Sequence, residues 1–117
     1  MLLTSPDNPT ARLVEPGLLR DILDMAVALD IHVISDEIYA GSVFDETRTP
    51  YRSMLGIAEK EELQRVHVVT GLSKDFPCPA MRVGCLVSAN PEVREVASAL
   101  GRFSGLSADT MELLAPV

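Results

Sequence analysis

The sequence predicts an α/β protein with a mostly parallel sheet in which one strand is antiparallel. Unbroken apolar runs at 31–35, 66–70 and 82–88 indicate strands that are covered on both faces. Helical patterns alternate with these runs, which favours a parallel sheet packed between helices. No helical pattern lies between the last two runs, so we expect the final strand to turn back antiparallel to its neighbour.

The first third of the chain contains two further elements and a turn. Residues 2–4 are apolar and are expected to form the end of a strand, and 5–11 are dense in turn-forming residues. A helix is expected to begin near Pro16, because proline suits the first turn of a helix, and to end near Asp30. Its apolar face repeats at helical spacing and consists of Leu19, Ile22, Leu23, Ala26 and Leu29.

The remaining helices are predicted from caps and spacing. Residues 41–50 are expected to be loop, and a short helix is expected within 51–58. Asn90 is a good helix cap, and Pro91 suits the first helical position. The apolar stripe of this helix is expected to comprise Val93, Val96, Ala97, Leu100 and Phe103. A last helix, capped by Ser107, is expected to reach Val117.

Composition limits the classes of function. The chain has 117 residues, which suits one domain or part of a larger one, and a net charge of −7. This charge argues against nucleic acid or an anionic membrane as the main partner. The first residues lack the basic region and long apolar stretch of a signal peptide, so we expect none, and no apolar run in the sequence reaches membrane-spanning length. Cys78 and Cys85 lack metal-ligand spacing, so we expect no metal and reduced cysteines in a cytoplasmic protein. His32 and His67 lie within apolar strands and are expected to be packed side chains rather than catalysts.

Polar side chains follow three of the predicted strands. Asn8 follows the first strand, Asp36 and Tyr39 follow the second, and Ser73 and Lys74 follow the third. Because open parallel sheets bind ligands at the carboxyl ends of their strands, these groups are candidates for one site. An amine at the mouth of an apolar sheet is a candidate nucleophile, since partial desolvation favours its neutral form.

The set of groups matches the needs of a pyridine aldehyde cofactor. An amine forms a Schiff base with an aldehyde, and a carboxylate keeps the ring nitrogen protonated. A phenol and an amide can hydrogen-bond the ring's phenolic oxygen, and Arg82, eight residues after Lys74, can hold a phosphate. Taken singly, each residue would more often be a surface charge, a helix cap or a turn residue. Their joint occurrence in one order favours the cofactor site.

Three segments in family order resemble motifs of the class I/II aminotransferases, which are fold-type I enzymes that use pyridoxal 5′-phosphate. Residues 71–75, followed by 81–84, resemble the lysine motif of that family. Residues 5–11 resemble its Asn-Pro…Asn-Pro-Thr-Gly motif, and 34–39 its Asp-Glu-x-Tyr motif. Within the family, 71–76 and 100–103 look most like the 1-aminocyclopropane-1-carboxylate synthase-like branch. The resemblance covers nearly the whole chain.

The resemblance implies a role for each candidate residue. Lys74 resembles the Schiff-base lysine, which also moves the proton between the substrate's Cα and the cofactor. Asp36 resembles the partner of the pyridine nitrogen, and Tyr39 and Asn8 resemble the partners of the phenolic oxygen.

The phosphate side of the resemblance is less complete. Arg82 resembles the phosphate clamp, with Ser73 as its helper. The chain departs from the family's usual serine or glycine at four positions, which are Ala11, Gly71, Pro77 and Ala80.

The resemblance also implies that residues 1–117 form part of the large, cofactor-binding domain, a partial three-layer α/β/α unit. A family enzyme adds an N-terminal part, a C-terminal small domain and a second subunit to make a homodimer. The expected function is a pyridoxal-phosphate-dependent change in an amino acid, by a transferase (transamination) or a lyase (synthase-type elimination).

Two alternatives to this function remain open. One is a truncated, non-catalytic product that is inert or only binds partners, and we expect the isolated 117-residue chain to be inactive. The other is an unrelated nucleotide-binding domain, which the absence of a Gly-x-Gly-x-x-Gly or Walker loop disfavours.

Overall fold

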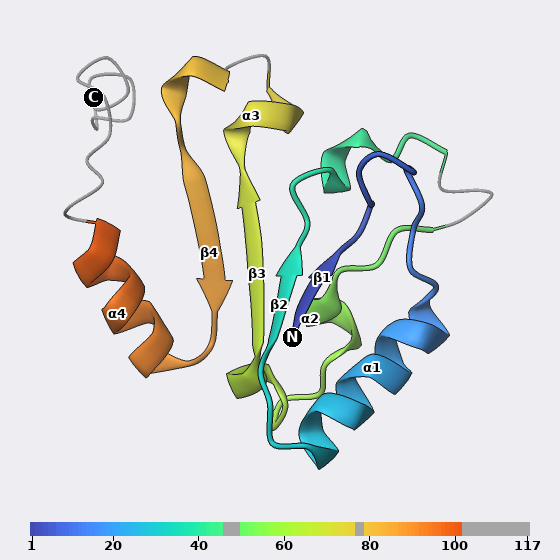
Figure 1. Ribbon diagram of the computed structural model, residues 1–117, viewed down its shortest axis with the longest axis vertical. Helices are drawn as coiled ribbons and strands as arrows, with labels where there is room; N and C mark the ends of the chain where they lie inside the picture. Colours follow the sequence, from blue (N-terminus) through green and yellow to red (C-terminus); the bar gives the residue numbers. More distant parts are fainter. Residues whose placement is uncertain (46–49, 77–78, 102–117) are drawn as a thin grey trace.

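One four-stranded sheet organises the part of the chain that the computed structural model describes, residues 1–45, 50–76 and 79–101. Its strands follow the sequence order β1 (Leu2–Thr4), β2 (Val33–Asp36), β3 (Val66–Gly71) and β4 (Gly84–Ser88). β1, β2 and β3 run parallel, whereas β4 runs antiparallel to β3 (Figure 1). The predicted sheet, mostly parallel with one antiparallel strand, is therefore confirmed.

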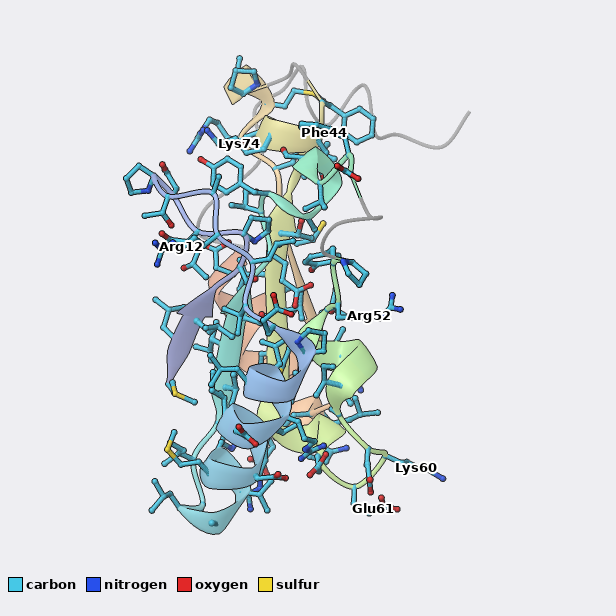
Figure 2. The ribbon with its side chains drawn as sticks, turned by 90° about the vertical axis from the view of Figure 1, so that its right-hand side faces the viewer. Arg12, Phe44, Arg52, Lys60, Glu61 and Lys74 are labelled. Atoms are coloured by element: carbon cyan, nitrogen blue, oxygen red, sulfur yellow. The ribbon has the colours of Figure 1, made fainter. Side chains whose placement is uncertain are left out.

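Two of the four helices that the structure describes lie in the crossovers between parallel strands, one lies between β3 and β4, and one follows β4. They are α1 (Pro16–Ala28), α2 (Met54–Ile57), α3 (Leu72–Asp75) and α4 (Pro91–Gly101), with short 3₁₀ turns η1 (Ala40–Ser42), η2 (Leu63–Arg65) and η3 (Pro79–Met81). α1 joins β1 to β2, and α4 lies beside β4 at the edge of the sheet away from β1 (Figure 1). None of the helices in the described ranges is long and apolar enough to cross a membrane. Figure 2 shows Lys74 and Phe44 at one end of the molecule and Lys60 and Glu61 at the other.

The core lies between α1, α2 and one face of the sheet. It consists of Leu19, Leu23, Ala26, Val33, Met54 and Val66, each at most 2% exposed. Burying a large aliphatic side chain contributes about 1.5–3 kcal/mol, so these contacts hold α1 against the strands. Leu29 was expected on the same face but is 61% exposed, because the helix ends at Ala28.

The opposite face of the sheet is more open. Since side chains alternate between the faces of a strand, Ile34, Val69 and Leu86 point away from the α1–α2 core. Their exposed fractions are 41%, 36% and 39%. The burial on both faces that the unbroken apolar runs predict is therefore not found at these three positions.

α4 begins as its sequence predicts but packs less than expected. Asn90 Oδ1 accepts hydrogen bonds from the backbone N–H groups of Glu92, at 3.0 Å, and Val93, at 3.2 Å, which confirms the predicted cap. No residue of α4 is buried, and Val96 and Leu100 of the predicted apolar stripe are exposed. Phe103 and the expected helix from Ser107 lie outside the described residues.

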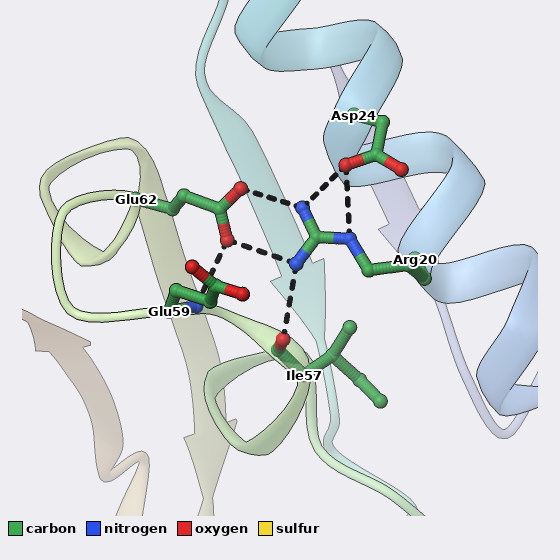
Figure 3. A network of polar contacts seen from close by, with 5 residues as sticks. All are labelled: Arg20, Asp24, Ile57, Glu59 and Glu62. Atoms are coloured by element: carbon green, nitrogen blue, oxygen red, sulfur yellow. Dashed lines mark hydrogen bonds and ion pairs between the residues drawn. The ribbon is translucent and has the colours of Figure 1, made fainter.

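Arg20 ties α1 to the chain between α2 and β3 (Figure 3). Its guanidinium donates to both carboxylate oxygens of Glu62, at 2.9 and 2.6 Å, and to the Ile57 carbonyl at 3.2 Å. Asp24, one turn along α1, accepts from Arg20 Nε at 3.0 Å. The hydrogen bonds from Arg20 lower the pKa of Glu62 below its usual value. This bidentate contact fixes the segment that leads into β3.

Candidate active site

Asn8 and Tyr39 meet at the carboxyl edge of the sheet. Asn8 lies in the turn after β1, and Tyr39 precedes η1 after β2. Because β1 and β2 are neighbouring parallel strands, both segments leave the sheet at the same edge. Asn8 Nδ2 donates a hydrogen bond to the Tyr39 hydroxyl at 3.3 Å. An amide and a phenol that are 31 residues apart in sequence are thus brought into contact.

Lys74 is the third predicted residue of this group. Its Nζ lies 5.4 Å from the centroid of the Tyr39 ring, which is within the range of a cation–π contact. The polar loop expected around Lys74 is in part a single helical turn, α3, that begins directly after β3. Lys74 is exposed, so the prediction that its amine is partly desolvated is wrong.

Asp36 and Ser73 lie at the same edge without joining this contact. Asp36 is the last residue of β2 and stands in register between Thr4 of β1 and Val69 of β3. Its carboxylate accepts a hydrogen bond from the Ile38 N–H at 3.2 Å, which fixes the turn after the strand. Ser73 is half-buried in α3.

Arg82 returns the chain to the sheet between η3 and β4. Its backbone adopts φ 54°, in the left-handed region that favours glycine. Its guanidinium donates to the Pro79 carbonyl at 3.2 Å, and Arg82 is exposed. Within the described ranges, Lys74 forms no hydrogen bond or ion pair with Asp36 or Arg82. The six predicted residues therefore share one edge of the sheet, and three of them, Asn8, Tyr39 and Lys74, are in contact.

A hollow of about 570 Å³ opens beside this group. It lies between the turn after β1 and residues 42–45, and its lining includes Asn8, Tyr39 and the exposed ring of Phe44. Lys74, Asp36, Ser73 and Arg82 do not line it. Asn8 and Tyr39 therefore border a space that can admit a small molecule, and the Lys74 amine lies over the Tyr39 ring.

Glu37 is a buried residue to which the sequence analysis gave no role. It is 5% exposed and accepts hydrogen bonds from Ser35 Oγ and the Met54 N–H, both at 2.9 Å, and from the Tyr51 hydroxyl. Burial and the Glu37 carboxylate raise the pKa of Tyr51, so this phenol stays protonated and donates. Glu37 thus anchors the segment that carries Tyr39. The signal that could have found it is a second carboxylate, directly after Asp36 and before the apolar Ile38.

The sheet topology and the lysine at its carboxyl edge define a class of protein. The model of the family "Aminotransferase class I and II" matches residues 1–115, so the chain belongs to this family. The chain has the fold of these enzymes, as a solved relative shows. Aminotransferase AspB from Helicobacter pylori superposes with a TM-score of 0.78 at 29% identity, over 94% of this chain and 29% of that chain.

Within the family, the chain is in the 1-aminocyclopropane-1-carboxylate synthase-like branch. It is 39% identical to 1-aminocyclopropane-1-carboxylate synthase 7 of Arabidopsis thaliana, over 98% of this chain and 26% of the relative. It is 38% identical to "Probable inactive 1-aminocyclopropane-1-carboxylate synthase-like protein 2" of Homo sapiens, over 97% of this chain and 20% of the relative. The chain thus spans about a quarter or less of the length of these two relatives.

Proposed function

We propose that the chain supplies part of the pyridoxal 5′-phosphate-binding domain of an enzyme that acts on amino acids. The contact of Lys74, Tyr39 and Asn8 at the carboxyl edge of the sheet carries this proposal. When bound, the cofactor supplies an electron sink for the carbanion left at the substrate's Cα. Membership of the aminotransferase family supports the same cofactor.

The chemistry of the three residues in contact fits the cofactor's phenolic oxygen and aldehyde. Tyr39 and Asn8 offer a hydroxyl and an amide that can donate to the phenolic oxygen. Lys74 offers an exposed primary amine, which an aldehyde in solution can reach. These groups come from different connections of the sheet, so the fold rather than local sequence brings them together.

The remaining candidates would hold the other two ends of the cofactor. Asp36 would accept a hydrogen bond from the ring nitrogen and hold a proton there. Ser73 and Arg82 would bind the phosphate, for which Arg82 has to exchange the Pro79 carbonyl for phosphate oxygens. Gly71 offers no side-chain donor to the phosphate.

The chain's own residues would have successive roles in the reaction. Tyr39 and Asn8 orient the ring through its phenolic oxygen. Lys74 would hold the cofactor through its amine, and the same amine, when free, would remove the proton from the substrate's Cα. Transamination and synthase-type elimination both begin with this proton transfer, and both remain within the proposal. The proposed assembly is a homodimer.

Reduction and mass spectrometry test the proposal directly. The purified chain is mixed with pyridoxal 5′-phosphate, reduced with borohydride and digested, and the modified peptide is identified. We expect modification at Lys74 together with an absorbance band in the visible range, and we expect Lys74→Ala to lose both. Lys60→Ala is the matched control, because it removes the chain's other lysine, at the far end of the molecule. Equal labelling of Lys60 and Lys74 would contradict the assigned site.

A second candidate function is a non-catalytic member of the same family. The similarity to a human relative named as probably inactive favours it, as does the engagement of Arg82 with Pro79. Such a protein would keep the fold and lose the cofactor chemistry. A folded chain, verified by circular dichroism, that gives no adduct at Lys74 would support this candidate over the enzyme.

A further inference from the structure

Three donors converge on the buried carboxylate of Glu37. One of its oxygens accepts hydrogen bonds from Ser35 Oγ and the Met54 N–H, and the other accepts one from the Tyr51 hydroxyl. A carboxylate carries acceptor oxygens only, so it suits a place where two hydroxyls and a backbone amide all donate. No cation in the described part of the chain forms an ion pair with Glu37, so these donors stabilise its charge there.

Two of the donors lie well beyond Glu37 in the sequence. Tyr51 and Met54 follow Glu37 by 14 and 17 residues, and they belong to residues 50–54, which lead the chain into α2 (Figure 1). Met54 is the first residue of α2 and is fully buried in the core. The Glu37 side chain therefore joins the end of β2 to the start of α2.

The backbone of Glu37 closes the turn that contains Tyr39. The Ala40 N–H donates to the Glu37 carbonyl at 2.9 Å, so Tyr39 is the third residue of the turn 37–40. On the other side of the residue, the Glu37 N–H donates to the Val69 carbonyl of β3 at 2.8 Å. The orientation of Glu37 thus sets the orientation of the turn, and with it the direction in which Tyr39 points.

We propose that Glu37 and Tyr51 are positioning residues for Tyr39. If Tyr51 cannot donate, the buried carboxylate loses part of its stabilisation and turns toward water, because an unpaired charge is costly in the interior. The turn follows this movement, and Tyr39 leaves its contacts with Asn8 and Lys74. The consequence for the cofactor rests on the proposed function, whereas the position of the Tyr39 ring can be measured without a cofactor.

Four variants separate positioning from stability. Tyr51→Phe removes one donor and keeps the ring, and Glu37→Ala removes the acceptor. Glu37→Gln is the conservative change, because its amide oxygen can accept from Ser35 and Met54 while its amide nitrogen donates to the Tyr51 oxygen. Asn90→Ala is the stability control, since it removes the cap of α4 and leaves the Glu37 contacts in place.

The first measurement is NMR of the cofactor-free protein with ¹³C-labelled tyrosine rings. The chain has two tyrosines, so Tyr51→Phe leaves Tyr39 as the single labelled ring. In the wild type we expect a nuclear Overhauser effect between the Tyr39 ring and the Lys74 side chain, whose amine lies 5.4 Å from the ring centroid. Tyr51→Phe and Glu37→Ala should lose this effect and shift the Tyr39 signal. Glu37→Gln and Asn90→Ala should retain the wild-type effect and signal.

The outcomes of this measurement are decisive in either direction. A folded Tyr51→Phe protein with an unchanged Tyr39 signal and Overhauser effect overturns the proposal, as does a wild type that lacks the effect. Loss of the effect in Asn90→Ala also overturns it, because lower stability alone would then account for the change. If Glu37→Ala does not fold, Tyr51→Phe and Glu37→Gln still decide the question.

The second measurement asks whether Tyr51 acts on cofactor binding through Tyr39. The affinity for pyridoxal 5′-phosphate is read from a titration of the visible absorbance band. The Tyr39 hydroxyl accepts from Asn8, so its proton is free for the phenolic oxygen, and Tyr39→Phe should weaken binding by roughly two- to tenfold. Tyr51→Phe should reproduce most of this loss in the wild type and add little in the Tyr39→Phe background, because residues that act in series are not additive.

The two measurements separate this proposal from the proposed function. Additive losses in the double variant would refute positioning through Tyr39 even if the cofactor binds. A wild type that gives no adduct at Lys74, but shows the Overhauser effect and loses it in Tyr51→Phe, would refute the proposed function and leave the positioning intact.

Discussion

His32 Nδ1 and His67 Nε2 lie 2.7 Å apart, and their rings stack with centroids separated by 5.0 Å. One of the two nitrogens has to donate and the other to accept, so at least one of the imidazoles is neutral. His67 is buried, and its other nitrogen lies 2.8 Å from Ser88 Oγ. Burial, and to a lesser extent the nearby His32, lower the pKa of His67.

This pair predicts that the protein loses stability in mild acid. The unfolded chain takes up a proton on His67 at the ordinary pKa of 6.5, whereas the folded chain resists it. The contribution of His67 to stability is therefore fully present above pH 6.5. It is lost as the pH falls from 6.5 toward the lowered pKa of the folded state. Urea unfolding between pH 7.5 and 5.5 should show this decline, and His67→Leu should reduce its slope. A wild type that becomes more stable over the same interval would contradict the prediction.

Arg20→Lys should lower the free energy of unfolding by about 1 kcal/mol. Lysine cannot reproduce the two parallel hydrogen bonds to Glu62 together with the bond to the Ile57 carbonyl. Chemical denaturation measures the effect. Arg52→Lys is the control, since among the residues that the structure describes Arg52 donates only to the carbonyl of its neighbour Tyr51, and it should change stability much less. Equal losses in the two variants would show that the Arg20 contacts contribute little.

Ala11→Gly should stabilise the protein by about 0.5–1 kcal/mol. Ala11 has φ 54°, a left-handed conformation that costs an L-residue roughly 1–2 kcal/mol, part of which is offset by the greater entropy of glycine in the unfolded chain. The midpoint of thermal unfolding should rise. Ala28→Gly, in the last turn of α1, should have the opposite effect, by up to about 1 kcal/mol. The same sign for both changes would argue against strain at position 11.

Tyr51→Phe should cost about 1–3 kcal/mol of unfolding free energy, because it leaves one oxygen of the buried Glu37 carboxylate without its donor. The matched change Tyr39→Phe removes an exposed hydroxyl that accepts one hydrogen bond, at 3.3 Å, from Asn8. It should alter stability by less than about 0.5 kcal/mol. Calorimetry of the two variants tests the difference, and a larger loss for Tyr39→Phe would reverse the roles assigned to the two phenols.

Local signals predicted much of the fold. The β-branched run that ends at Thr70 marked β3, and the missing helical pattern after it marked β4 as antiparallel. Asn90 followed by Pro91 located the start of α4. α3 was missed because four residues are too few to show a helical period. Leu29 was misplaced because its spacing fits the helix, while the chain already turns at Asp30, with φ 55°.

The candidate site was less accessible from sequence. Motif order predicted that Asn8, Tyr39 and Lys74 belong together, and the parallel strands do bring them to one edge. The exposure of Lys74 depends on which segments cover α3, and no local pattern encodes that. The Glu37 network requires the Tyr51 hydroxyl and the Met54 N–H to meet a carboxylate across a loop. Contacts of this kind depend on tertiary structure alone.

The placement of the two lysines has a practical consequence for measuring association. Lys60 and Lys74 stand at opposite ends of the molecule (Figure 2), so a short amine-to-amine crosslinker cannot bridge them within one folded copy. Any covalent bridge between two lysine side chains under native conditions would therefore join separate molecules. Sequencing of the crosslinked peptides would then show which ends of the two copies face each other.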